Sequence, residues 1–214
     1  HAAFSYRVLA EPAPPYLPLP GPGGRGGFPH PTGTPNGYQP PFVAPNLVTL
    51  ENLPFSRNDP WLPDGATQTV GNNVEAYTDY VSPNGYTTGD LHAEISAPGA
   101  FDYTYNVLAS PTGTDAQQMA TVTQLFFVTN FLHDWYYDFG FDEASGNGQV
   151  DNFGRGGLGG DSLRAEAQDY SGRNNANMST PADGARPRMQ MYMYDTRGLR
   201  AIDIPAGHPN AGRS

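Results

Sequence analysis

The strongest pattern of hydrophobic and polar positions in this chain predicts one long helix, from about residue 115 to residue 139. Hydrophobic side chains recur there with the 3.6-residue period of a helix, and others fill a second face. The first face comprises Met119, Val122, Leu125, Phe126, Thr129, Leu132, His133 and Tyr136, and the second comprises Phe127, Phe131 and Trp135. Thr112 or Thr114 can cap the start of the helix, and Gly140 can end it. Because a helix that is apolar on most sides is buried, we expect a core helix with faces that the rest of the chain has few residues to cover.

Short strands are predicted on both sides of this helix. Before it, alternating runs separated by Asn, Gly and Pro indicate a β-rich lobe. These runs lie at residues 2–9, within residues 48–86, and at residues 91–95 and 101–107. After the helix, residues 163–168 and 189–194 are strand candidates, with an Asp183-Gly184 turn between them. The chain is therefore predicted to have an α+β fold.

The N-terminal part contains a segment rich in proline and glycine. Residues 11–45 hold most of the 22 prolines, which fix φ and remove hydrogen-bond donors. We expect an extended, polyproline-like arm that is docked by its aromatic and leucine side chains. The predicted division is a first strand at 1–10, the arm at 11–47, the lobe at 48–194 and a tail at 195–214, where the pattern is lost and the chain looks interrupted.

Composition excludes several classes of partner and site. The formal net charge is −10, and all 11 basic residues are Arg, so nucleic acid and anionic membranes are unfavourable partners. The acidity can serve solubility or cation binding. No cysteine is present, which excludes disulfides and thiolate metal sites. No apolar run of about 18 residues predicts a membrane span, and the composition suits a secreted protein.

Histidine spacing argues against a zinc site built from neighbouring positions. None of the five histidines belongs to an HExxH motif, whose i, i+4 spacing places two ligands on one helix face. His133, followed by Asp134, either polarises a group in a cleft or is a core histidine satisfied by a carboxylate; the second interpretation is favoured. His1 offers an amine and an imidazole to a metal such as copper, but no second histidine is clearly placed beside it.

Two loops after the helix are candidates for ligand sites, one for phosphate and one for calcium. The cluster GRGGLGG, residues 154–160, lacks the Lys-Ser/Thr end of a phosphate loop, so its glycines are expected to allow positive φ and close backbone approach. An oxygen-rich loop could hold calcium, although the spacing of a calcium-binding helix–loop–helix is missing. Its candidate ligands are Asp142, Glu143, Asn147, Asp151 and Asn152. There is also no GxSxG elbow for a serine nucleophile.

The step Asn174-Asn175-Ala176-Asn177 is the best candidate for binding. On an edge strand, its backbone N–H and C=O groups could bind an extended peptide by strand addition, and the Asn amides could add hydrogen bonds. The alternative is an Asn-rich turn, since Asn tolerates the left-handed conformation. Composition alone favours the turn.

Several long motifs closely resemble the fungalysin family of secreted zinc metallopeptidases. They are ATVTQLFFVTNFLHDWYYDFGFDEASGN, NFGRGGLGGD, AQDYSGRNNANMSTPADG and RMQMYMY, with TQTVGNNVEAYTDY and HAAFSYRVLAEPAPP upstream. The resemblance covers most of the chain, and the Pro/Gly arm is its least similar part.

The resemblance implies the β-rich N-terminal lobe of a thermolysin-like metallopeptidase. Asn175 and Ala176 would then contact a peptide or protein substrate, with Asn177 alongside. The family's HExxH helix, third zinc ligand and proton donors lie C-terminal to the segment matched by RMQMYMY, so zinc is expected on a C-terminal half that continues this chain or is a separate one. The alternative is a non-catalytic structural or self-assembling extracellular protein that pairs through its edge strand.

Overall fold

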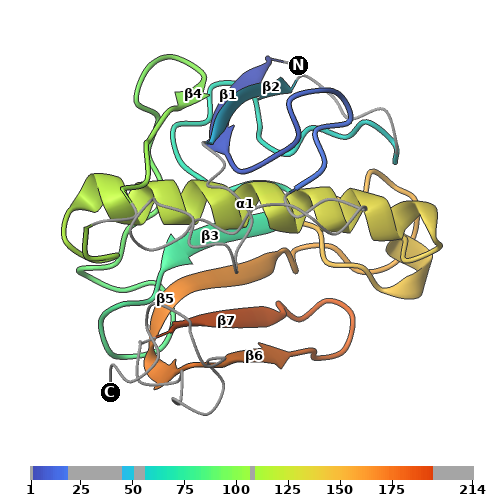
Figure 1. Cartoon of the computed structure of the whole chain (residues 1–214). Coiled ribbons are helices and arrows are strands. Elements are labelled where there is room, and N and C mark those ends of the chain that lie inside the picture. Colours follow the sequence, from blue (N-terminus) through green and yellow to red (C-terminus); the bar gives the residue numbers. More distant parts are fainter. Residues whose placement is uncertain (1, 19–44, 51–55, 107–108, 195–214) are drawn as a thin grey trace, which may run out of the picture.

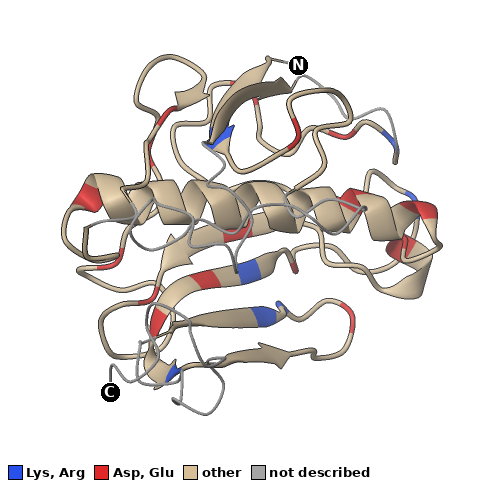
Figure 2. Cartoon of the chain, viewed as in Figure 1, with Lys and Arg blue, Asp and Glu red and all other residues tan. Residues whose placement is uncertain are grey.

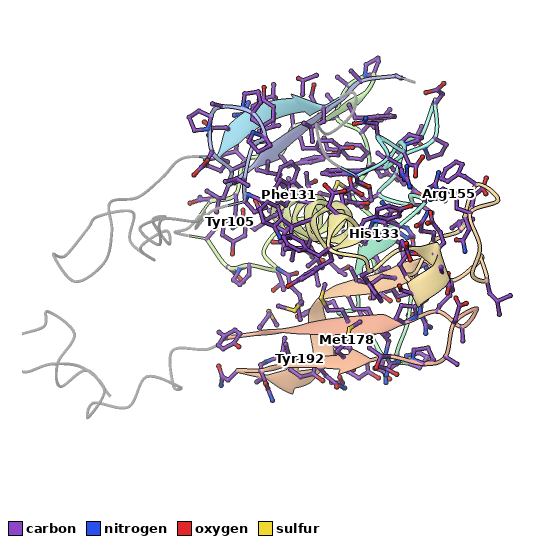
Figure 3. All side chains as sticks on the ribbon, turned by 90° about the vertical axis from the view of Figure 1, so that its right-hand side faces the viewer. Tyr105, Phe131, His133, Arg155, Met178 and Tyr192 are labelled. Carbon is purple, nitrogen blue, oxygen red and sulfur yellow. The ribbon has the colours of Figure 1, made fainter. Side chains whose placement is uncertain are left out.

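The chain folds around one long helix that lies between two β-sheets (Figure 1). The computed structural model describes residues 2–18, 45–50, 56–106 and 109–194. Helix α1 spans Asp115–Asp138 and packs against strands of both sheets. Figure 3, which views α1 along its axis, shows one sheet on either side of it. The predicted α+β class is confirmed.

The smaller sheet has the strand order β2-β1-β4. Strand β1 (Phe4–Val8) pairs antiparallel with β2 (Asn46–Leu50) and parallel with β4 (Ala100–Phe101). Alternate residues of β1 are buried, so one face of this sheet packs on the helix.

The larger sheet has the order β3-β5-β7-β6. Strands β3 (Val74–Thr78), β5 (Leu163–Arg173) and β7 (Arg188–Met193) run parallel, and β6 (Ala176–Ser179) joins β7 antiparallel as the edge. The strands predicted at 163–168 and 189–194 are confirmed, and the first extends five residues further. A short 3₁₀ helix, η1 (Glu143–Ser145), follows α1.

Helix α1 is the core element, as predicted. Thr114 is its N-cap, and its side-chain oxygen accepts a hydrogen bond from the Gln117 backbone N–H at 3.2 Å. Phe126 and Phe127 are fully buried and contact Tyr6 of β1, with ring centroids 6.0 and 6.2 Å apart. The core therefore joins the helix to a strand more than a hundred positions away in the sequence.

The predicted burial pattern is wrong at the C-terminal end of α1. Leu132 and Tyr136 are 43% and 55% exposed, whereas Asp134 is only 5% exposed. Asp134 is buried because its Oδ2 accepts a hydrogen bond from the indole N–H of Trp61 at 2.8 Å. At this end of α1, the buried side of the helix therefore includes a polar residue that is hydrogen-bonded to a residue far away in the sequence.

Two strand predictions before the helix are also wrong. Residues 91–95 make isolated bridges at His92 and Glu94 in place of a continuous ladder, and the strand predicted at 101–107 is limited to Ala100–Phe101. Glu94 bridges to Gln68, where the Thr69 N–H donates to the Ala93 carbonyl and the Ile95 N–H to the Thr67 carbonyl. His92 bridges instead to Tyr77, so the segment contacts two different parts of the chain.

Part of the predicted arm is described. Tyr16 and Leu17 pack against the core, and the Glu11 backbone N–H donates to the Leu17 carbonyl at 2.9 Å. Docking of the remaining arm, His1 and the tail lie outside the described residues. Among the described helices, none is long and apolar enough to cross a membrane.

Candidate functional site

The Asn-Asn-Ala-Asn step leads into β6, the exposed edge strand of the larger sheet. Asn174 adopts the left-handed conformation with φ of 56°, and the strand begins two residues later at Ala176. All four residues of β6 are exposed. The motif therefore contains both a turn at its first Asn and an edge strand at Ala176 and Asn177, and peptide binding by that strand stays a prediction.

The backbone of β6 presents alternate residues away from the sheet. The Tyr192 backbone N–H donates to the Asn175 carbonyl at 3.2 Å, which fixes the register with β7. In an antiparallel pair, the residues between hydrogen-bonded positions point their N–H and C=O groups outward. Ala176 and Met178 occupy those positions, so their backbone groups are free to pair with an added strand.

The side chains at this edge differ in whether they are hydrogen-bonded to the rest of the sheet. The side chain of Asn175 is exposed and makes no hydrogen bond with another described residue. The Asn177 amide is engaged, because its Nδ2 donates to Gln190 Oε1 at 3.0 Å. Met178 is 48% exposed and lies on the opposite face of the strand, toward the methionines of β7. Figure 3 labels Met178 on β6 and Tyr192 on the neighbouring strand β7.

Next to this edge, the sheet carries a group of buried carboxylates that sequence reasoning missed. Asp79, Glu166 and Asp169 are each 0% exposed, and one oxygen from each lies within 4.8 Å of the other two. Figure 2 shows acidic and basic residues following one another across β3, β5 and β7. The alternation of Arg164 and Glu166 with small residues signals a strand with a polar face, but it does not reveal that three acids meet.

Hydrogen bonds connect this carboxylate group to the edge strand. Gln190 Nε2 donates to Asp169 Oδ2 at 2.5 Å, while Gln190 Oε1 accepts from Asn177. Asp169 reaches this position because the strand has a bulge, with φ of 53° at Gln168. The geometry therefore joins β6, β7 and β5 through one chain of polar contacts.

Burial perturbs two of the three carboxyl groups. It raises the pKa of Glu166 to about 7, with Asp79 and Asp169 adding to the shift against Tyr77 and Arg188. Burial also raises the pKa of Asp79 to about 6, and the charges of Asp169 and Asp90 reinforce it. Both shifts follow from placing negative charges together away from water.

A neighbouring acid on the same sheet behaves in the opposite way. A hydrogen bond from His92 at 3.0 Å and the Arg186 guanidinium lower the pKa of Glu75 to about 2. The negative charge of Glu75 is therefore balanced by its neighbours, unlike the charges of Asp79 and Glu166.

His133 is the core histidine that the sequence favoured. Its Nδ1 lies 3.1 Å from Asp134 Oδ1, and its Nε2 lies 3.4 Å from the Asn147 amide nitrogen. The Asn147 amide donates to Nε2, so the proton is assigned to Nδ1. His133 is a residue of α1 (Figure 3), and both of its ring nitrogens have a hydrogen-bond partner.

The glycine cluster has the steric role predicted for it. Gly154, Gly156, Gly157 and Gly160 all have positive φ. At Gly157 an added Cβ would lie 2.1 Å from the Glu143 carbonyl oxygen, so the backbone there approaches too closely for any side chain.

The oxygens of the expected calcium loop serve local structure. Asp142 accepts from the Ser145 N–H, and Asp151 from the Phe153 N–H. Glu143 accepts hydrogen bonds from Tyr137 and Arg155, both at 2.7 Å. The Asn147 and Asn152 amides donate to Gln149 and to the Gly156 carbonyl. Calcium in this loop stays a prediction that these contacts do not favour.

The described residues do not fit the zinc ion implied by the resemblance. Among them, one group of three or more His, Asp or Glu side chains lies close enough to hold a metal ion, and it consists of Asp79, Glu166 and Asp169. Protein zinc sites are built mainly from His and Cys, and this group contains neither.

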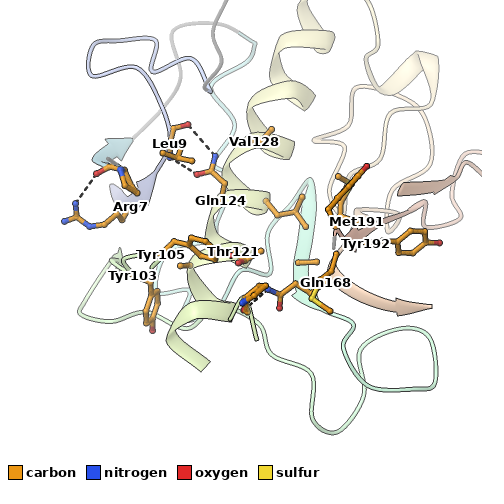
Figure 4. A pocket seen from close by; sticks show the side chains of 17 residues that line it. Arg7, Leu9, Tyr103, Tyr105, Thr121, Gln124, Val128, Gln168, Met191 and Tyr192 are labelled. Atoms are coloured by element: carbon orange, nitrogen blue, oxygen red, sulfur yellow. Dashed lines mark hydrogen bonds between the residues drawn. The ribbon is translucent and has the colours of Figure 1, made fainter. Parts of the chain in front are cut away.

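A groove of about 510 Å³ runs between α1 and the C-terminal half of β7 (Figure 4). Leu125 and Val128 of the helix and Met191 and Met193 of the strand line it, so its walls are mainly apolar. Gln124 borders it and is held by the Leu9 backbone N–H at 2.7 Å. Asp79, Glu166 and Asp169 do not line this groove, so the groove and the three buried carboxylates are separate features.

Comparisons with known proteins agree on one family. A family model described as fungalysin metallopeptidase (M36) matches residues 41–204. The chain is 38% identical over 179 residues to an extracellular metalloproteinase MEP of Fusarium vanettenii, covering 72% of the chain and 27% of that protein. It is 41% identical over 152 residues to one of Pyricularia oryzae, covering 69% and 23%, and 39% identical over 159 residues to extracellular metalloproteinase 3 of Trichophyton tonsurans, covering 68% and 24%. The chain therefore spans about a quarter of the length of these relatives.

Proposed function

Because the chain belongs to the fungalysin metallopeptidase family, we propose that it is the N-terminal part of a secreted zinc metalloendopeptidase and supplies the strand that binds the peptide substrate. The observation that carries the proposal is the edge strand β6, whose Ala176 and Met178 backbone groups point outward. The extracellular relatives support secretion, and their names support a metal-dependent peptidase.

In this proposal the chain positions the substrate. An extended peptide pairs with the N–H and C=O of Ala176, and the free Asn175 amide adds a hydrogen bond to the peptide backbone. Asn177 contributes indirectly, since its amide is tied to Gln190 and holds β6 against β7. Backbone pairing tolerates many substrate sequences, because it reads main-chain groups that all peptides share.

The zinc ligands and the general base are expected elsewhere in the whole protein. The described residues contain no group that fits zinc, and the printed sequence contains no HExxH motif. The relatives are about four times as long as their matched part, which leaves ample sequence for those residues.

The test uses the whole peptidase and two substitutions on the edge. Ala176→Pro removes an outward N–H without removing a bond to β7, and Asn175→Ala removes the free amide. Each is expected to lower kcat/KM on a peptide substrate about tenfold, the effect of roughly 1.4 kcal/mol for one lost hydrogen bond. Asn84→Ala, an exposed amide in the loop after β3, is the matched control and should leave kcat/KM unchanged.

A second measurement links the effect to the backbone. In a substrate series with one amide at a time replaced by an ester, which removes a substrate N–H, the loss should concentrate at the position that pairs with the Ala176 carbonyl. It should persist in the Ala176→Pro variant, because proline keeps that carbonyl. Folded edge variants with full kcat/KM would reject the proposed role of β6. Concentration-dependent assembly through β6, with no peptidase activity of the whole protein in zinc, would favour the structural alternative.

A further inference from the structure

We propose that Asp79, Glu166 and Asp169 form a binding site for a divalent cation of the calcium class. Asp79 follows β3, and the other two residues lie on β5, on either side of its bulge. One oxygen from each lies within 4.8 Å of the other two, and all three side chains are fully buried. This spacing lets three carboxylates contact one ion.

The charge balance of this group requires a positive partner. Three carboxylates lie together, and the nearest cation among the ion pairs of the described residues is Arg188, whose Nε is 3.8 Å from Glu166 Oε2. Ionised carboxylates buried away from water repel one another strongly and are costly unless paired or bound to a metal. One arginine at this distance compensates a single charge incompletely.

Two oxygens of this group receive no hydrogen bond within the described residues. Asp79 Oδ1 and Glu166 Oε2 are buried and accept no hydrogen bond within the described part of the chain. Buried polar atoms are nearly always satisfied, so two such atoms in one group indicate a ligand between them.

The other carboxylate oxygens are held in place by donors. The Gly85 backbone N–H donates to Asp79 Oδ2 at 2.9 Å, and the Tyr77 hydroxyl donates to Glu166 Oε1 at 2.7 Å. Asp169 accepts from Ser171 and Gln190. Such outer contacts orient metal ligands, and here they leave the free oxygens of Asp79 and Glu166 available.

The donor set favours a hard cation. All the ligand atoms are carboxylate oxygens, which suit calcium and magnesium, whereas zinc prefers nitrogen and sulfur. The ion would also stabilise the edge strand, because Asp169 binds Gln190, which in turn binds Asn177 of β6. The competing occupant is a single proton shared between Asp79 and Glu166.

Cation binding is tested on the full 214-residue chain after treatment with a chelator. Calorimetric titration with calcium and, separately, magnesium should show one equivalent of bound ion. At an ion concentration of about 100 times Kd, the melting temperature should rise by roughly 5–10 °C. Terbium should bind in place of calcium and luminesce on excitation of tyrosine, because the Tyr77 hydroxyl bonds to a ligand.

Four variants locate the ion. Glu166→Gln keeps an acceptor for Tyr77 but should abolish the calcium-dependent melting shift, and Asp79→Asn should do the same. Glu94→Gln, at an exposed carboxylate, should retain it. Tyr77→Phe should still bind calcium by calorimetry but lose most of the terbium signal, which identifies the site even if a ligand variant fails to fold.

Two results would overturn the inference. Binding that survives in folded Glu166→Gln and Asp79→Asn proteins would place the ion elsewhere. A chain that binds no calcium or magnesium, and whose melting temperature changes through this group with pH alone, would show that a shared proton occupies it.

Discussion

The replacement of Glu166 by Gln offers a sharp test of the buried charge, when cations are removed by a chelator. The folded-state pKa of Glu166 is raised to about 7, from 4.5 for an ordinary glutamate, chiefly because the side chain is buried. Between these two values the folded protein holds a proton that the unfolded chain has lost. The contribution of Glu166 to the free energy of unfolding therefore decreases as pH rises through this window.

The magnitude follows from the shift. A difference of roughly 2.5 pKa units corresponds to about 3 kcal/mol at pH values above 7, and to almost nothing below about 4.5. Gln cannot ionise and still accepts a hydrogen bond from Tyr77. We therefore expect Glu166→Gln to stabilise the chelated chain at pH 8 by up to about 3 kcal/mol, or roughly 6–12 °C in melting temperature. At pH 5 the gain should be less than about 1 kcal/mol.

The assay is thermal unfolding followed by circular dichroism at the two pH values. Glu94→Gln is the control and should show no difference between them, because its carboxylate is exposed. Calcium at about 100 times Kd should offset most of this difference at pH 8, since it stabilises the original chain and not the variant. An equal loss of stability in Glu166→Gln at both pH values would refute the reasoning, because it would show that the contacts of Glu166 matter and its charge does not.

Three further predictions concern stability, each measured by unfolding in urea or acid. Gly157→Ala should cost several kcal/mol more than Gly154→Ala, because both have positive φ but only the first places a Cβ against the Glu143 carbonyl; equal losses would contradict the steric account. Thr114→Ala should cost about 1 kcal/mol by removing the N-cap of α1, and no change would contradict its capping role. Glu75, whose pKa is lowered to about 2, contributes stability above pH 4.5 that is lost as pH falls toward 2, and Glu75→Gln should flatten that acid limb.

Local pattern predicted the elements that tertiary contacts did not modify. The apolar period and the Thr114 cap located α1, because both act within a few residues of the chain. The exposed Leu132 and the buried Asp134 could not be predicted in this way. Asp134 is hydrogen-bonded by Trp61, which lies far earlier in the sequence, and the pattern within the helix carries no sign of that contact.

The candidate sites differ in the same respect. The Asn-rich segment predicted either a turn or an edge strand, and the family resemblance favoured the strand. The structure has an edge strand at Ala176 and Asn177. The carboxylate group was not predicted, because Asp79 and Glu166 meet only through the pairing of β3 with β5, and the bulge at Gln168 brings in Asp169. Neither event leaves a periodic signal in the sequence.

Amide hydrogen exchange along β6 of the whole peptidase tests the central claim most directly. With a bound, uncleaved peptide inhibitor, exchange of the outward Ala176 and Met178 backbone amides should slow, because the peptide carbonyls now accept their hydrogen bonds. Exchange of the Asn177 backbone amide, which faces β7, should change little. Saturation with the inhibitor and unchanged exchange at Ala176 and Met178 would contradict the assignment of β6 as the substrate-binding strand.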